Sequence, residues 1–292
     1  MLRWTDFLIS SLSRIYGLLP YWCLKTFAKG FAWFWFDVVR FRRYTILRNL
    51  TIAFPQMSHV DRYQLARQSL VYQVLVFLDV LLIPGVRSNS LDRLFQFHGI
   101  EHFKKVHEKG KGVFLMSLHI GSGDLGVTAL ALKGLPLSLI SKKFKNAAVN
   151  NFWFGLRERN GVKFIDAHGS KTAFEIMTAM KNNRGVVFVI DQFMGKPYGI
   201  ETTFFGRKTG TAYGLALFAI KAKAPVIPLY TYQDQTGVHH IVFGDPVPVI
   251  ENENRDLQIL QMTESYNRTL EEIIKAHPEQ WMWIHRRWKK FE

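Results

Sequence analysis

The stretch Gly112-Val-Phe-Leu-Met-Ser-Leu-His-Ile-Gly-Ser-Gly-Asp124 decides the fold of this chain, because it joins an apolar run to a turn and a helix start. Residues 112–118 are apolar enough to form a buried strand. Ser122 and Asp124 are residue types that begin helices, and we expect this helix to continue to about Lys133. The strand–turn–helix order predicts an α/β unit, which places functional groups at the carboxyl ends of its strands.

The same alternation of strands and helices continues from about residue 99. The predicted strands are 112–118, 136–142, 162–166, 185–191, 225–231 and 238–244. The predicted helices are 124–133, 146–160, 171–183, 211–223 and 256–276. The strand Gly185–Asp191 is apolar throughout, as expected when helices cover both faces of a sheet. We therefore predict an α/β fold with a central mixed, largely parallel sheet flanked by helices.

Residues 1–95 are expected to form a separate helical region before an α/β domain at 96–292. Its clearest helix is Arg62–Ile83, which Pro84-Gly85 ends. The aromatic run Phe31–Phe36 is followed by basic residues, as in a hydrophobic membrane anchor with a basic flank. These basic residues are Arg40, Arg42, Arg43 and Arg48.

The anchor has two open interpretations. No stretch reaches the roughly 18 uncharged apolar residues of a spanning helix, and an anchor in this region could either span the membrane or lie on its surface. The alternative is a soluble helical hairpin whose aromatic side chains belong to the core.

Composition narrows the classes of partner. The formal net charge of +15 favours nucleic acid, anionic membrane or acidic proteins as partners. A single cysteine, Cys23, excludes an internal disulfide and a cysteine-rich metal site. No H-E-x-x-H pattern occurs, and we expect no catalytic metal.

His119 and Asp124 form the most informative pair of chemically active residues. A histidine takes a proton from a hydroxyl near neutral pH, and a carboxylate at its other ring nitrogen fixes the tautomer. Gly121 and Gly123 would let backbone approach a substrate closely. The alternative is structural: Ser122 caps a helix, Asp124 complements its dipole and His119 has no chemical role.

The same segment also matches a dinucleotide-binding fingerprint. Gly121-Ser-Gly-Asp-Leu-Gly126 has the G-x-G-x-x-G spacing between a strand and a helix. Such a site needs an acidic residue about 20 residues later, where this chain has the basic segment Ser141–Lys145. Basic residues there could suit a 2′-phosphate, so this remains a minor alternative.

Three later segments carry further candidates. Asp191-Gln192 ends a buried strand, as His119 does, so both are expected to face one crevice. Thr209–Gly214 is expected to start a helix whose amides can hold an anion. Pro278–Lys289 mixes tryptophans with basic residues, which suits a membrane interface, an anionic headgroup or stacked single-stranded nucleic acid.

Taken in order, these segments resemble the late lipid A biosynthesis acyltransferases (the lauroyl and myristoyl transferases) over nearly the whole chain. The resemblance rests on the anchor, on His119-x4-Asp124 and on the Pro278-Glu-Gln-Trp-Met-Trp-Ile-His-Arg-Arg-Trp ending. Further matches are Lys142-Lys143, Asp191-Gln192, Phe204-Phe205-Gly206, Thr209–Gly214 and Ala224-Pro225-Val226-Ile227-Pro228.

The resemblance implies an enzyme that moves a fatty acyl group from acyl carrier protein to a hydroxyl of a membrane lipid, without another cofactor. His119 would be the general base and Asp124 its orienting partner, with Gly121, Gly123 or Lys142 near the oxyanion. The expected substrate-binding residues are Lys142, Lys143, Asp191, Gln192, Arg207, Arg286 and Arg287. The enzyme would be anchored at the cytoplasmic face of the bacterial inner membrane, where basic surface attracts carrier protein and anionic lipid.

Two departures from the family pattern concern the acceptor lipid. The lipid A enzymes more often have Glu where this chain has Asp124, and usually arginine where it has Lys142. Lysine lacks the bidentate recognition of phosphate that arginine provides. A lysophospholipid, an amino-acid lipid or another glycolipid therefore remains an alternative acceptor.

Two other classes of protein fit less well. A serine lipase would need a G-x-S-x-G elbow, which this sequence lacks. A membrane-bound nucleic-acid-binding protein would explain the charge and the aromatic-basic tail. It would not explain why His119 and Asp191 both follow strands, so we expect no nucleic-acid partner.

Overall fold

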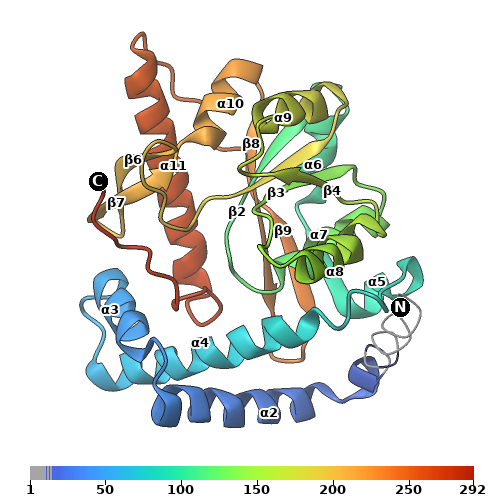
Figure 1. Ribbon diagram of the computed structural model, residues 1–292, viewed down its shortest axis with the longest axis vertical. Helices are drawn as coiled ribbons and strands as arrows, with labels where there is room; N and C mark the ends of the chain where they lie inside the picture. The colour runs from blue at the N-terminus through green and yellow to red at the C-terminus, as the bar shows by residue number, and fades with distance from the viewer. Residues whose placement is uncertain (1–10, 12, 14) are drawn as a thin grey trace.

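A seven-stranded sheet lies at the centre of the computed structural model, which describes residues 11, 13 and 15–292 (Figure 1). Its order is β1-β9-β8-β2-β5-β3-β4. The strands are β1 (Phe95–His98), β2 (Val113–Ser117), β3 (Leu137–Ser141), β4 (Lys163–Asp166), β5 (Gly185–Val189), β8 (Val226–Gln233) and β9 (His239–Phe243). Neighbouring strands are parallel except for β8 and β9. The predicted mixed, largely parallel α/β sheet is confirmed.

Helices cover both faces because alternate residues of the central strands point in opposite directions. In β2, Phe114 and Met116 join one core, whereas Val113 and Leu115 join another. The first core includes residues of α9, α10 and α11, and the second includes residues of α6 and α7. The helices that flank the sheet, including α8, have the following bounds: α6 (Ile100–His107), α7 (Gly123–Leu132), α8 (Ala147–Glu158), α9 (Thr172–Lys181), α10 (Gly214–Ala222) and α11 (Arg255–Ala276).

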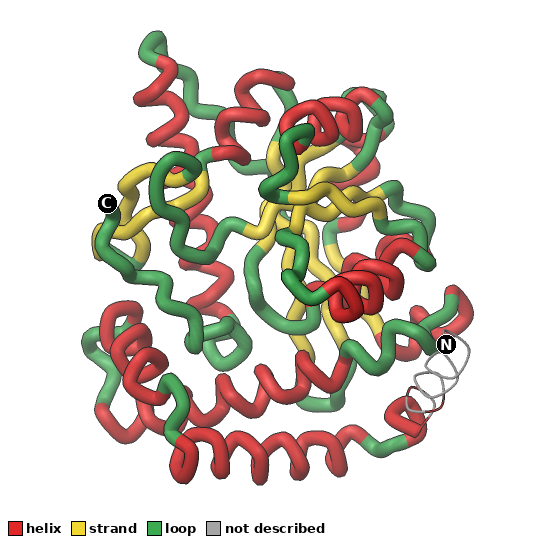
Figure 2. Tube along the Cα trace, in the orientation of Figure 1, coloured by secondary structure: helices red, strands yellow, loops and turns green. Residues whose placement is uncertain are grey.

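The N-terminal helices lie across one end of the molecule, with α2 and α4 side by side (Figures 1 and 2). The segment contains α2 (Tyr21–Trp33), the π-helix η1 (Phe34–Val39), α3 (Arg43–Ala53), α4 (His59–Asp79), the 3₁₀ turn η2 (Ser88–Ser90) and α5 (Leu91–Leu94). The expected change at residue 95 coincides with the start of β1. Ala28 of α2 and Leu65 of α4 nevertheless share a core with Phe114 of the sheet, so the two regions are packed together.

The segment that was expected to anchor the chain lies partly outside the described residues, which leave out residues 1–10, 12 and 14. No helix in the described part of the chain is long and apolar enough to cross a membrane. Phe36 is fully buried, whereas Trp33 and Phe34 are 54% and 48% exposed. The aromatic run therefore contributes to both the core and the surface.

The main difference from the predicted elements is a separate hairpin, in which β6 (Gly199–Phe204) pairs antiparallel with β7 (Arg207–Ala212). The prediction that Thr209–Gly214 starts a helix is wrong, because β7 includes this segment as far as Ala212 and α10 begins only at Gly214. Thr209 and Thr211 are fully buried in the hairpin, where β-branched residues pack well. Their amides do not form a helix-terminal anion site.

Candidate active site

Strand register brings His119 and Asp191 together. Neighbouring strands β2 and β5 are parallel, and Ser117 pairs with Val189 at their carboxyl ends. His119 and Asp191 each follow two residues later, so the two side chains meet at one edge of the sheet. The Nδ1 atom of His119 lies 2.8 Å from Oδ1 of Asp191, and the backbone N–H of His119 donates to Oδ2 at 3.0 Å. The expected shared position of these residues is confirmed.

Asp191 is buried and ionised. Trp281 donates its indole N–H to Oδ2 of Asp191 at 2.7 Å. Burial alone would raise the pKa of Asp191, but the charge of His119, the hydrogen bonds from its ring and backbone, and the hydrogen bond from Trp281 lower it to about 2. Because an ionised carboxylate only accepts hydrogen bonds, Nδ1 of His119 carries a proton and Nε2 holds the lone pair of the neutral ring.

The ring of His119 is reachable and its proton affinity is increased. Its side chain is 41% exposed, compared with 2% for Asp191. Burial would lower the pKa of His119, but the charge and hydrogen bond of Asp191, together with the charge of Asp124, raise it. The amide nitrogen of Gln192 lies 3.3 Å from Nε2. A polar group therefore stands beside the basic nitrogen, where a substrate oxygen would approach.

Asp124 lies in the first turn of α7 and acts on His119 through its charge. Asp191 occupies Nδ1, the position from which a carboxylate orients the ring, so Asp191 supplies the orientation that we expected from Asp124. A catalytic role of Asp124 stays a prediction.

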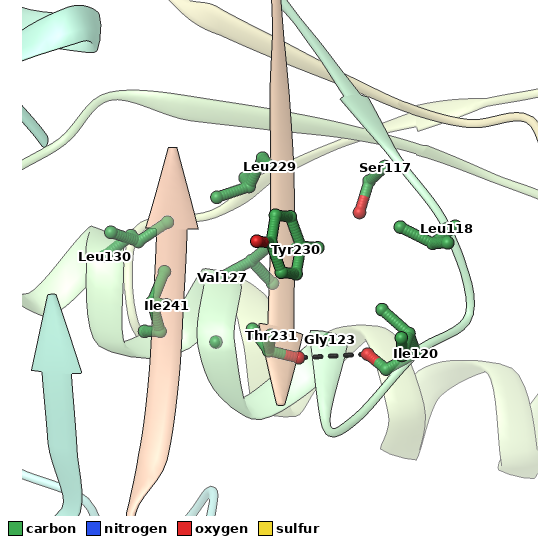
Figure 3. Close-up of a pocket in the computed structure, with 11 residues that line it drawn as sticks. Ser117, Leu118, Ile120, Gly123, Val127, Leu130, Leu229, Tyr230, Thr231 and Ile241 are labelled. Carbon is green, nitrogen blue, oxygen red and sulfur yellow. Dashed lines mark hydrogen bonds between the residues drawn. The ribbon is translucent and has the colours of Figure 1, made fainter. Parts of the chain in front are cut away.

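The loop that carries His119 is packed tightly against β8. A Cβ atom at Gly121, whose φ is +54°, would collide with the backbone oxygen of Thr231. Thr231 donates from Oγ1 to the Ile120 oxygen at 3.1 Å, as Figure 3 shows. The void between this loop, α7 and β8 measures only about 10 Å³, too little for a substrate. The expected close approach of Gly121 is thus to backbone of the sheet rather than to a ligand.

The glycines of the G-x-G-x-x-G match have a packing explanation. Gly126 would also meet Thr231 if it had a Cβ, through the side-chain methyl. Gly123 has no atom within 4 Å of its Cβ position and is exposed. Gly121 and Gly126 are therefore needed for α7 and its preceding loop to pack on β8. Of the three glycines, only Gly123 has room for a Cβ atom.

A buried carboxylate that the sequence did not predict, that of Asp79, is hydrogen-bonded to the same loop. Ser122 donates to Oδ2 of Asp79, the last residue of α4, and Tyr16 donates to Oδ1 at 2.9 Å. Asp79 is 2% exposed. The N-terminal helices thus help to hold the loop between His119 and Asp124.

The C-terminal segment forms the other wall. Met282 donates its backbone N–H to the backbone oxygen of His119 at 3.1 Å, and Ile120 and Trp281 form an isolated antiparallel β-bridge. The prediction that the tryptophans of this segment face a membrane is wrong, because all three pack around Phe204 or against each other. Trp281, Trp283 and Trp288 are buried.

His285 stands close to the pair without being a second base. Burial, as the main cause, lowers the pKa of His285 to about 4, so the ring is neutral near pH 7. Its Nε2 accepts the backbone N–H of Phe193 at 3.2 Å. This contact fixes the segment directly after Asp191-Gln192.

The basic residues that were predicted to contact the substrate lie in different parts of the structure. Lys142 and Lys143 follow β3 at the same sheet edge as His119, and both are exposed. Lys143 lies 3.2 Å from Asp166. Arg286 is exposed, and Arg207 lines a groove with α3 and α4.

Arg287 is a structural residue and not the substrate contact that we expected. It is fully buried, its guanidinium lies over the ring of Phe204, and it donates to the Gly210 oxygen and to Thr211 at 2.6 Å. Sequence reasoning missed this burial because arginines are mostly exposed.

Comparison with known proteins adds a family to this geometry. The sequence profile described as bacterial lipid A biosynthesis acyltransferase matches residues 1–290. The chain belongs to this family. It is 23% identical over 237 residues to a lipid A biosynthesis acyltransferase of Haemophilus influenzae, covering 81% of this chain and 72% of the relative. It is also 23% identical to the lipid A biosynthesis palmitoleoyltransferase of Escherichia coli, covering 93% of both chains.

A relative with a different name matches as well. A phosphatidylinositol mannoside acyltransferase of Mycolicibacterium smegmatis is 20% identical over 226 residues, covering 77% of this chain and 72% of the relative. Membership of the family makes this protein an acyltransferase, and the expected resemblance is confirmed.

Proposed function

We propose that this acyltransferase moves a fatty acyl group from the thioester of acyl carrier protein to a hydroxyl of a lipid A precursor or a similar glycolipid. The observation that carries the proposal is the His119–Asp191 pair. It leaves Nε2 of a partly exposed imidazole available as a base, in a chain of this family.

The transfer is direct. Nε2 of His119 takes the proton from the acceptor hydroxyl, and the oxygen attacks the thioester carbonyl. The tetrahedral intermediate then collapses with cleavage of the C–S bond, and the imidazolium returns its proton to the departing thiolate. The ionised Asp191 stabilises the imidazolium between these two proton transfers.

Neighbouring groups would support this chemistry. The amide of Gln192 beside Nε2 can hydrogen-bond the reacting oxygen. Lys142 at the same sheet edge supplies a cation for the oxyanion or for a substrate phosphate. Asp124 adds negative charge that favours the imidazolium.

The surface suits substrates that are acidic or embedded in a bilayer. The net charge of +15 attracts an acidic carrier protein and anionic lipid. The exposed aromatics Trp33 and Phe34 would rest in the headgroup region of the inner membrane on its cytoplasmic side. Both contacts would orient the sheet edge that bears His119 toward the lipid.

A second acceptor class has specific support. The match to a phosphatidylinositol mannoside acyltransferase extends over most of the chain, so phosphoglycolipid acceptors belong among the candidates. Lys142 in place of the arginine common in lipid A enzymes is compatible with such a change of headgroup.

The test is acyl transfer by the detergent-purified full chain, with labelled acyl carrier protein as donor. The acceptor panel should contain lipid A precursors, phosphatidylinositol mannosides, lysophospholipids and ornithine lipids. Label in a lipid A precursor supports the first proposal, and label in another acceptor alone transfers support to the second. No transfer to any acceptor, with the thioester intact, contradicts the proposed donor or reaction.

A further inference from the structure

A cationic groove lies outside the active site. It has a volume of about 490 Å³ and is formed by α3, the N-terminal half of α4 and the start of β7. This volume lies in the range of small-molecule sites. Its lining residues do not include the loop after β2 or the end of β5. Four of them carry basic side chains: Arg48, His59, Arg62 and Arg207.

Arg62 differs from the other three because it is only 7% exposed, and one of its donor nitrogens has no hydrogen-bond partner among the described residues. Its Nη2 donates to the backbone oxygens of Phe54 at 3.2 Å and Met57 at 2.8 Å. Its Nε is buried and has no hydrogen-bond partner among the described residues. No described carboxylate lies within ion-pair distance of this guanidinium, and a buried donor without a partner is costly.

An anion bound in the groove would supply the negative charge and the hydrogen-bond acceptors that the guanidinium of Arg62 lacks. Arg48 and Arg207 are exposed at its surface and can approach the same ligand. Among the described residues that line the groove, none is Asp or Glu. Arginine guanidinium groups bind phosphate oxygens with two parallel hydrogen bonds, so a phosphate group fits this charge pattern.

Apart from its basic residues and Thr51, the groove is lined by apolar and aromatic side chains. Leu47, Ile52 and Tyr63 provide apolar walls. Tyr44, which lines the groove, is 78% exposed, and Val60, the residue after His59 in the chain, is 66% exposed. An amphiphile whose phosphate reaches the arginines could therefore keep its hydrocarbon chains in the bilayer beside these side chains.

We propose that this groove binds the phosphate headgroup of an anionic membrane phospholipid, as a site separate from the active site. Such a lipid would fix the orientation of the N-terminal helices on the membrane. The proposal does not depend on the chemistry of His119. It adds a defined lipid contact to the general attraction of a basic protein for an anionic surface.

The test is calorimetric titration of the detergent-purified full chain with three soluble probes. Dihexanoyl phosphatidylglycerol carries phosphate and tails, inorganic phosphate lacks the tails, and dihexanoylglycerol lacks the phosphate. We expect saturable binding of the phosphatidylglycerol and at least about tenfold weaker binding of the other two. Inorganic phosphate that binds as tightly as the lipid would overturn the lipid assignment and leave a simple anion site.

Variants connect this binding to the groove. Arg207→Gln and Arg48→Gln, both at exposed positions, should each weaken the phosphatidylglycerol by about tenfold. Arg62→Lys should weaken it as well, and the two exposed positions keep the test valid if that variant folds poorly. The matched control is Arg255→Gln, an exposed arginine in α11, which should bind as the wild type does.

His119→Ala separates this proposal from the proposed function. It should keep lipid affinity even where acyl transfer is lost. Unchanged affinity in the Arg48→Gln, Arg207→Gln double variant would contradict the groove site, whatever the acyl-transfer assays show.

Discussion

His119 has a proton affinity set by the carboxylate behind it. Because the pKa of His119 is raised above its ordinary 6.5, the neutral base predominates only above that raised value. The catalytic efficiency, kcat/KM, should therefore rise with pH through an inflection above 6.5. Burial acts in the opposite direction, so the position of the inflection depends on Asp191.

Asp191→Asn tests this dependence. Without the negative charge, burial lowers the pKa of His119, so the inflection should move to lower pH. The rate should fall roughly 10²–10⁴-fold, because the imidazolium loses its stabilising partner. The measurement is the pH profile of kcat/KM for both proteins. Asp234→Asn is the control, since the pKa of Asp234 is also lowered to about 2 but its hydrogen bonds lie in the β8–β9 turn. A rate loss without a shift of the inflection would contradict the pairing.

At the scale of elements, the loop between β2 and α7 must stay against β8. Gly121→Ala adds left-handed strain of about 1–2 kcal/mol and a collision with the Thr231 backbone. We expect lower stability and a marked loss of kcat, because the loop carries His119. Gly110→Ala is the matched control, as Gly110 has a similar φ of +70° and open space around its Cβ position.

Thermal unfolding and kcat for both glycine variants separate strain from collision. Gly110→Ala should show only the strain and retain its kcat. Equal kcat in the two variants would mean that contact with β8 does not position His119.

Arg287 joins the C-terminal segment to the hairpin, so its replacement should affect stability more than substrate binding. Arg287→Met removes buried charge-assisted hydrogen bonds to Gly210 and Thr211, and we expect a loss of roughly 2–4 kcal/mol. Chemical denaturation measures this loss, with Arg286→Gln at an exposed position as the comparison. A large rise in KM with normal stability would instead make Arg287 a substrate contact.

The sequence predicted the central strands because their apolar runs are continuous. It also indicated the placement of His119 and Asp191, since each follows such a run. It did not predict the contact of Trp281 with Asp191, because this hydrogen bond joins residues 90 positions apart. The hairpin was missed because Thr209–Gly214 contains two glycines and resembles a helix start, and Arg287 was misplaced because its charge suggested exposure.

At the scale of the whole molecule, the N-terminal helices connect the active site to the proposed membrane surface. Asn49 of α3 donates to the oxygens of Trp283 at 2.8 Å and His285 at 2.7 Å. Asp79 of α4 binds Ser122 in the loop after His119. The sequence-based division at residue 95 follows the change from helices to sheet, but these long-range contacts could not be derived from local patterns.

The exposed aromatics of this region should hold the protein on a bilayer. Trp33→Ser combined with Phe34→Ser removes two partly exposed aromatic side chains, and we expect roughly tenfold weaker association with vesicles. Co-sedimentation with phosphatidylcholine–phosphatidylglycerol vesicles measures it. Phe174→Ser is the control, because Phe174 is 73% exposed on α9. An equal effect of the control would remove the special role of the N-terminal surface.

The most direct test of the account is the rate of acyl transfer by His119→Ala in a protein whose fold is verified by its thermal transition. With the acceptor identified by the panel, we predict a fall of roughly 10²–10⁴-fold at saturating donor, because the general base is absent. A folded His119→Ala protein that transfers acyl groups at nearly the wild-type rate would contradict the assignment of His119 as the base.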